Sequence, residues 1–209
     1  MIDNRMGAIF DLDGTLLDSM GVWRKIDEDF LGKRGFIVPD DYMVAITSKN
    51  FDAAAEYTKE RFNLPESEEE IIKEWFDMAI EAYTNEVKLK AGVIDYLKQL
   101  KAEATSSDER LFRPCLTHCG IMEYFDAFTV TQEVKRGKGF PDVYQLAAEK
   151  LSLKPKQCVV YEDILKGVEG AKMDDFYVVG VEDIHSSYEK NEIMQLSDRY
   201  ILSFEELLD

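Results

Sequence analysis

The sequence predicts an α/β fold: a Rossmann-like, doubly wound parallel sheet that carries an inserted α-helical domain. Short apolar runs alternate along the chain with segments of helical periodicity, which is typical of parallel strands joined by crossover helices. Residues 19–88 differ, because they form charged amphipathic segments with little strand pattern. A chain of 209 residues has room for both parts. We therefore expect residues 1–18 and 89–209 to form the sheet domain and residues 19–88 the helical domain.

The first predicted strand is the apolar run at residues 6–10, which is followed by Asp11, Asp13 and a turn at Gly14. A short apolar run that stops at charged residues and a glycine is typical of a buried parallel strand ending in a loop. Asp11 is therefore expected at the carboxyl end of that strand, with Asp13 two positions further along.

Later elements follow the same alternation. After Gly92 we expect a helix that ends near Lys101, since apolar residues recur on one stripe there. Strands are predicted at residues 128–130, 158–161 and 177–181, helices at residues 141–151 and 164–173, and a short strand and last helix within residues 200–209. Ligands of such sheets bind beyond the carboxyl ends of the strands, so Asp11, Asp13, Asp163 and the loop VKRGKGF are expected at one edge.

The composition restricts the partners. The formal charge of -17, from 25 Lys and Arg against 42 Asp and Glu, disfavours binding to nucleic acids and to anionic membranes. No apolar run has the length of a membrane span, and the stretch MIDNRMGAIF lacks the long apolar segment of a secretory signal. Three cysteines do not make a disulfide framework. We expect a cytoplasmic protein, a monomer or weak homodimer, with no nucleic-acid or membrane partner.

The acidic residues at the strand ends suggest phosphoryl chemistry. Asp11 is a candidate nucleophile, because a carboxylate can attack phosphorus and form an aspartyl phosphate. A hard cation such as Mg²⁺ would have to offset the repulsion between two anions, and Asp11, Glu162 and Asp163 could bind it through oxygen. Asp13 could then act as general acid and base. Lys138, in the loop after a strand, could balance the charge of a phosphate.

Three segments, FDLDGTLLDS, KGFPDVY and VVYEDILKGVEGAK, resemble the first, third and fourth motifs of the haloacid dehalogenase superfamily. The resemblance is to its branch of phosphatases similar to β-phosphoglucomutase. It implies a sheet core of that superfamily, with the helical insert as a cap that excludes water and selects a small phosphorylated metabolite such as a sugar phosphate.

The resemblance also implies roles for single residues. Asp11 would be nucleophile and metal ligand, and Asp13 would be general acid and base with its carbonyl oxygen on Mg²⁺. Lys138 would bind the phosphate, and Glu162 and Asp163 would anchor the metal.

The second motif of the superfamily is a strand ending in Thr or Ser, and here it departs from the pattern. Thr105 stands in the phosphate-binding place, but the second core strand before it is expected to be missing or shortened, because AEA precedes it in place of five or six apolar residues. Three explanations are open: a deletion or incomplete sequence, a helix end that unwinds into a poor strand, or a loss of activity.

These observations predict a Mg²⁺-dependent phosphomonoesterase that works through an aspartyl phosphate. One alternative is a phosphosugar mutase similar to β-phosphoglucomutase. Mutases of that branch usually carry a histidine in the region of SMGVWRKID and an arginine in the cap, where this chain has Lys49, so the resemblance favours hydrolysis. The other alternative is a catalytically impaired binding protein of the same fold, motivated by the missing strand. Arg24 and Lys49 are candidates to bind a substrate anion.

Overall fold

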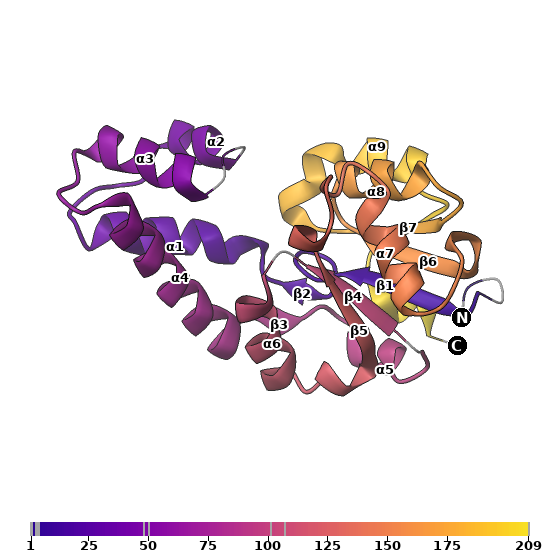
Figure 1. The fold of residues 1–209 in the computed structure, drawn as a ribbon. Coiled ribbons are helices and arrows are strands. Elements are labelled where there is room, and N and C mark those ends of the chain that lie inside the picture. Colours follow the sequence, from indigo (N-terminus) through magenta and orange to yellow (C-terminus); the bar gives the residue numbers. More distant parts are fainter. Residues whose placement is uncertain are drawn as a thin grey trace. The chain divides into compact units, whose positions relative to one another are not determined.

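The computed structural model describes residues 2, 5–47, 49, 51–100, 102–106 and 108–208, and only the backbone of residues 40, 44, 47 and 102–106. The chain divides into two compact units (Figure 1). Unit 1 comprises Met1–Ser19 and Val87–Asp209, and unit 2 comprises Met20–Glu86. Within the described residues, none of the helices combines the length and the apolar character that crossing a membrane requires.

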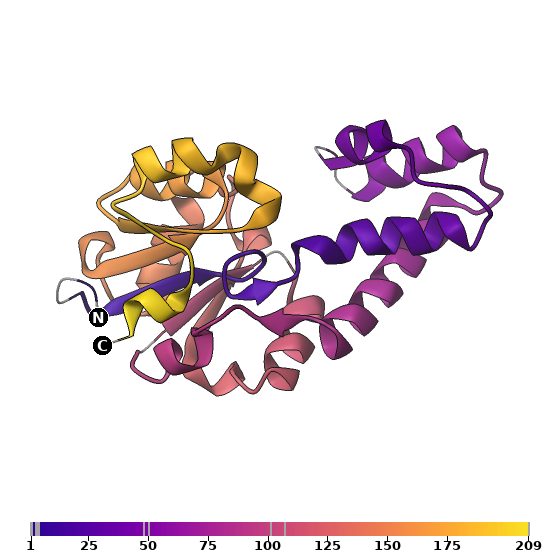
Figure 2. The same cartoon turned by 180° about the vertical axis from the view of Figure 1, so that it is seen from behind.

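Unit 1 is built on a six-stranded sheet in the order β5-β4-β1-β6-β7-β8, and every neighbouring pair runs parallel (Figures 1 and 2). The strands are β1 (Gly7–Asp11), β4 (Ala102–Ser106), β5 (Phe125–Val130), β6 (Cys158–Glu162), β7 (Tyr177–Val181) and β8 (Arg199–Ile201). Counted along the chain this is the doubly wound order 3-2-1-4-5-6, which confirms the predicted fold class. The order reverses between β1 and β6, the place where such sheets bind their ligands.

Helices cover this sheet. Unit 1 contains α5 (Val93–Leu97), α6 (Glu109–His118), α7 (Asp142–Lys150), α8 (Leu165–Lys172) and α9 (Lys190–Leu196), and the short 3₁₀ helices η2 (Met122–Tyr124), η3 (Thr131–Glu133), η4 (Pro155–Gln157), η5 (Ile184–Glu189) and η6 (Phe204–Leu207). The strands and helices predicted after residue 125 are all present. The exception lies earlier, because the helix expected to end near Lys101 stops at Leu97.

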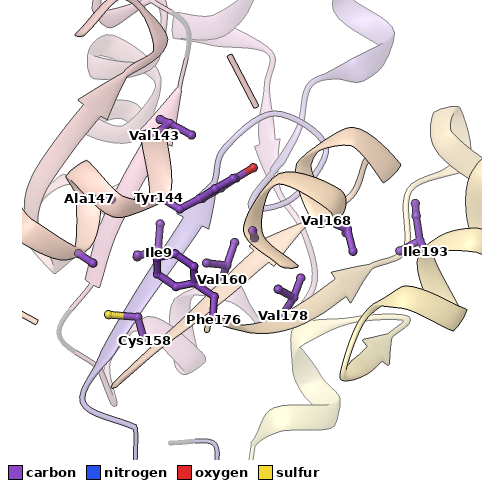
Figure 3. Close-up of a cluster of buried hydrophobic side chains, with 12 residues drawn as sticks. Ile9, Val143, Tyr144, Ala147, Cys158, Val160, Val168, Phe176, Val178 and Ile193 are labelled. Atoms are coloured by element: carbon purple, nitrogen blue, oxygen red, sulfur yellow. The ribbon is translucent and has the colours of Figure 1, made fainter. Parts of the chain in front are cut away.

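The two faces of β1 explain why its sequence is continuously apolar. Ile9 belongs to a buried cluster with residues of β6, β7, α7 and α8, among them Val160 and Tyr144 (Figure 3). Phe10 points to the opposite face, where its ring stacks on that of Tyr161 with centroids 4.4 Å apart. A strand that is covered on both sides needs apolar residues at every position.

The expectation that the second core strand is missing is wrong. β4 lies between β1 and β5 and pairs in parallel with both, so that Asp11 stands opposite Thr105. At five residues it equals β1 in length, so it is not shortened relative to its neighbour either. Of the three explanations, the structure contains the second: a weak strand sequence takes up strand conformation, because the backbone groups of β1 and β5 offer it hydrogen-bonding partners on both sides.

The inserted segment is helical, as predicted. Unit 2 contains α1 (Met20–Gly32), α2 (Asp40–Thr47), α3 (Phe51–Phe62) and α4 (Glu68–Asn85), and no strand among its described residues. α4 begins with a capping box in which Ser67 and Glu70 exchange hydrogen bonds between side chain and backbone. The large side chains Phe30, Tyr42, Trp75 and Tyr83 are buried in this unit.

A short antiparallel pair of strands lies in unit 1, where the inserted segment begins and ends. β2 (Leu17–Asp18) lies beside β3 (Lys88–Leu89), with Leu17 opposite Leu89. Consequently the two ends of the insert leave unit 1 from neighbouring strands.

Candidate active site

Three carboxylates meet at the carboxyl ends of β1 and β6. Asp11 is the last residue of β1, Glu162 is the last residue of β6, and Asp163 follows directly. Because Phe10 pairs with Tyr161, Asp11 and Glu162 lie at the same level of the sheet. All three residues are buried, and one carboxylate oxygen of each lies within 4.8 Å of the others.

Lys138 supplies the positive charge of this cluster. It lies in the loop between η3 and α7, and its ammonium group contacts Asp11 Oδ1 and lies 3.0 Å from Glu162 Oε1. The Lys138 side chain is only 18% exposed, so this pairing is poorly screened by solvent. The loop thus brings one cation to two of the three carboxylates.

Burial dominates the electrostatics of the site. It raises the pKa of Asp11 well above its ordinary value, with the charges of Glu162, Asp163 and Asp13 acting in the same direction and that of Lys138 against them. Burial, and then the charge of Glu162, raise the pKa of Asp163 to about 7. For Lys138 burial acts to lower the pKa, but the neighbouring carboxylates outweigh it and raise the pKa. Three buried carboxylates against one ammonium leave an excess of negative charge.

The donor set fits a hard divalent cation. All three residues offer carboxylate oxygen, the ligand type of Mg²⁺. Glu162 Oε2 and Asp163 Oδ2 are buried and have no hydrogen-bond partner among the described residues. Such orphaned anionic oxygens are costly unless a cation meets them. Oxygens that share an octahedral Mg²⁺ lie about 3 to 4 Å apart, so a small contraction of the cluster would suffice.

The turn after β1 carries Asp13. Gly14 has a φ of 79°, a left-handed conformation that glycine adopts without strain, and the backbone N–H of Leu17 returns to the carbonyl of Leu12. Asp13 lies on this turn beside the carboxylate cluster, and Ser19 donates a hydrogen bond of 2.6 Å to Asp13 Oδ1. The turn therefore presents a second, half-buried carboxylate close to Asp11.

Thr105 is placed only by its backbone. It lies in β4 opposite Asp11, at the same edge of the sheet. Its side chain lies outside the described residues, so its predicted contact with phosphate remains a prediction.

Two buried hydroxyl groups hold the acidic residues, and the sequence analysis did not single them out. Thr15 Oγ1 donates to Asp163 Oδ1 at 3.1 Å, and Tyr144 OH donates to Glu162 Oε1 at 2.7 Å. Thr15 could have been suspected from its place beside Gly14 in the first motif. Tyr144 lies on α7, and the sequence carries no signal that its hydroxyl reaches β6.

The two residues proposed to bind a substrate anion belong to unit 2. Arg24 pairs with Glu28 one helical turn away, at 2.9 Å, with a largely exposed side chain. Lys49 lies over the ring of Tyr57, 5.4 Å from its centroid. Both contacts are ordinary for a solvated helical surface.

Comparison with known proteins agrees with this geometry. A family model described as "Haloacid dehalogenase-like hydrolase" matches residues 8–181. Fructose-1-phosphate phosphatase YqaB of Escherichia coli is 28% identical over 177 residues, which are 82% of this chain and 94% of that protein. Hexitol phosphatase A of Escherichia coli is 30% identical over 195 residues, 90% of this chain and 88% of that protein. The crystal structure of β-phosphoglucomutase from Clostridium difficile superposes with a TM-score of 0.72 at 18% identity, covering 98% of this chain and 93% of that one, which shows a shared fold.

Proposed function

This chain belongs to the haloacid dehalogenase-like hydrolases, and we propose that it is a Mg²⁺-dependent phosphomonoesterase that acts on a small phosphorylated sugar or sugar alcohol. The resemblance noted from its motifs is therefore confirmed at the level of the family. The substrate class is supported by the names of two relatives, which are phosphatases of fructose 1-phosphate and of hexitols.

The observation that carries the proposal is the position of Asp11. It lies at the carboxyl end of the central strand, at the point where the strand order reverses, with Lys138 on one of its oxygens and two further buried carboxylates beside it. A cation held by Asp11, Glu162 and Asp163 would offset the repulsion between Asp11 and the phosphate. Asp13 would add its backbone carbonyl to those ligands.

The chain's own residues then divide the reaction into two steps. An oxygen of Asp11 forms a bond to phosphorus while the ester oxygen of the substrate leaves, and Asp13 gives that oxygen its proton. Asp13 next takes a proton from water, whose oxygen attacks phosphorus and breaks the bond to Asp11. Ser19 orients the Asp13 carboxylate through its 2.6 Å hydrogen bond. Lys138, and by expectation Thr105, bind the phosphate oxygens throughout.

We assign unit 2 the part of a cap that excludes water and reads the substrate, with Arg24 and Lys49 as candidate anion-binding residues. The alternative of a catalytically impaired binding protein was based on the expectation that the second core strand is missing. That basis is gone, because β4 is present between β1 and β5. A mutase would use the same Asp11 chemistry, and the test below distinguishes it.

The test is phosphate release from p-nitrophenyl phosphate, fructose 1-phosphate, a hexitol phosphate and β-glucose 1-phosphate, with and without Mg²⁺. We expect Mg²⁺-dependent release that Asp11→Asn lowers by about 10³-fold or more, because the nucleophile is lost. Asp18→Asn is the matched control, since Asp18 is an exposed carboxylate on β2, seven positions after Asp11 in the chain. Formation of glucose 6-phosphate from β-glucose 1-phosphate would identify a mutase, and a folded but inert wild type would contradict the proposal.

A further inference from the structure

Two glycines of α8 lie directly against the cluster of acidic residues and its lysine. Gly167 and Gly170 are both buried, and three positions apart on a helix they share one face. Glycine inside a helix destabilises it relative to alanine, so two glycines in an eight-residue helix need a reason. The distances around each glycine supply one.

Gly167 receives the side chain of Glu162. A Cβ atom added to Gly167 would lie 2.4 Å from both Cδ and Oε2 of Glu162 and 2.8 Å from Oε1. The carboxylate therefore rests on the bare backbone of α8, and a side chain at residue 167 would force it to leave the position in which it contacts Lys138 at 3.0 Å and Tyr144 at 2.7 Å.

Gly170 receives the backbone of the loop that carries Lys138. A Cβ atom there would lie 1.9 Å from the carbonyl oxygen of Lys138 and 2.9 Å from both the N and O atoms of Phe140. These are backbone atoms, which cannot rotate aside as the end of a side chain can. Contacts of Cβ under 3.0 Å are essentially never seen, so an alanine would displace the loop by about 1 Å or more.

We propose that Gly170 is a positioning residue for Lys138 and that Gly167 is a positioning residue for Glu162. The bare face of α8 lets the lysine loop approach closely enough for the ammonium group to reach Asp11 and Glu162, and it leaves room for the Glu162 carboxylate in the acidic cluster. The inference rests on the proposed function, since it assigns Lys138 to phosphate and Glu162 to Mg²⁺.

The chain offers matched controls in the same loop. Gly137 and Gly139 flank Lys138, and a Cβ atom at either would meet no described atom within 4 Å. Neither glycine has the positive φ that would make an alanine strained. Gly137→Ala and Gly139→Ala therefore change the composition of the loop without pushing it away from α8.

The experiment measures binding by calorimetry on the whole protein, with Mg²⁺ alone and then with inorganic phosphate in the presence of Mg²⁺. We expect Gly170→Ala to weaken phosphate binding by about tenfold to a hundredfold, because Lys138 moves by about 1 Å. Its affinity for Mg²⁺ should stay within about twofold of the wild type. Gly167→Ala should instead weaken Mg²⁺ binding by about tenfold or more, because the Glu162 carboxylate is displaced from its position against α8. Gly137→Ala and Gly139→Ala should bind both as the wild type does.

A double-mutant cycle separates positioning from a general loss of structure. If Gly170 acts through Lys138, then adding Gly170→Ala to Lys138→Met should change phosphate affinity by no more than about twofold. A further large and additive loss would contradict the inference.

The binding measurements distinguish a failure of this inference from a failure of the proposed function. If the wild type binds both probes and Gly170→Ala binds phosphate equally well, the inference is wrong while the proposed function stands. If the wild type binds neither Mg²⁺ nor phosphate, the proposed function is wrong and the inference falls with it. Should Gly170→Ala fail to fold, a crystal structure of the wild type with Mg²⁺ and phosphate decides. The Lys138 carbonyl must then touch α8 at Gly170 while the ammonium group holds the phosphate, and a loop lying away from α8 would contradict the inference.

Discussion

Lys138 is the residue that makes a buried group of three carboxylates tolerable. Its charge lowers the pKa of both Asp11 and Asp163, against burial and mutual repulsion, which raise them. One ammonium group does not balance three carboxylates, and the orphaned oxygens of Glu162 and Asp163 mark where a second cation would bind. The chemistry of the site thus depends on two positive charges: the ammonium group of Lys138 and a cation bound from solution.

A second buried acid, Asp27 in unit 2, gives a prediction for stability against pH. Burial raises the pKa of Asp27 from 3.8 to about 7, only partly opposed by a hydrogen bond of 3.3 Å from Tyr42 OH. Since the folded state binds this proton more tightly than the unfolded state, protonation stabilises the fold. The stabilisation is complete below pH 4 and is lost as the pH rises through about 7, at most about 4 kcal/mol in all.

We therefore expect Asp27→Asn to raise the melting temperature at pH 8 and to flatten its dependence on pH between 6 and 8. Thermal unfolding at pH 6, 7 and 8 measures this. Asp29→Asn, at an exposed position of the same helix, is the matched control and should leave the pH dependence unchanged. A wild type whose melting temperature does not fall between pH 6 and 8 would exclude a buried Asp27 of raised pKa.

Among the elements, β4 is the one whose local sequence and observed structure disagree. AEATS contains neither an apolar run nor a strand-favouring pattern, yet its backbone pairs with β1 on one side and β5 on the other. Main-chain groups in the middle of a sheet need partners, and a gap there would leave the inner edges of both neighbours unpaired. The sheet therefore stabilises a strand that the residues themselves do not favour.

Hydrogen exchange tests this element directly. We expect the amides of residues 103–106 to exchange about as slowly as those of β1, since both strands are paired on two sides. Exchange is followed by mass spectrometry in the presence of Mg²⁺, with the peptide that contains β1 as the reference. Exchange of residues 103–106 within seconds, with β1 protected, would show that β4 is not a stable strand.

At the scale of the whole molecule, binding of Mg²⁺ should be coupled to the stability of unit 1, which contains all of the acidic cluster. A ligand at about 100 times its dissociation constant stabilises the folded state by about 2.7 kcal/mol. We expect Mg²⁺ to raise the melting temperature by several degrees relative to EDTA, and the increase to vanish in Asp163→Asn. Asp18→Asn should keep the increase. Equal stabilisation of wild type and Asp163→Asn would place the ion elsewhere.

Local pattern was sufficient for most of the fold and for the identity of the acidic residues. The apolar runs of β1, β6 and β7 and the helical insert are visible because burial on two faces, or on one stripe, imposes a period on neighbouring residues. Asp11 and Glu162 could be named because each directly follows such a run, and Asp163 because it comes next after Glu162. The resemblance of three segments to motifs of a known family added that these residues occur in the order typical of that family.

The sequence by itself determined the strands that are rich in apolar residues. It also determined the charged residues at the ends of those strands. Only the tertiary structure decided that β4 is a strand, that Lys138 reaches Asp11 and Glu162, and that Thr15 and Tyr144 hold the acids in place. Those outcomes depend on partners far apart in the chain, such as the 148 positions between Thr15 and Asp163. Hydrogen bonds and close contacts of this kind have no local period, so they arise only when the sheet brings their partners together.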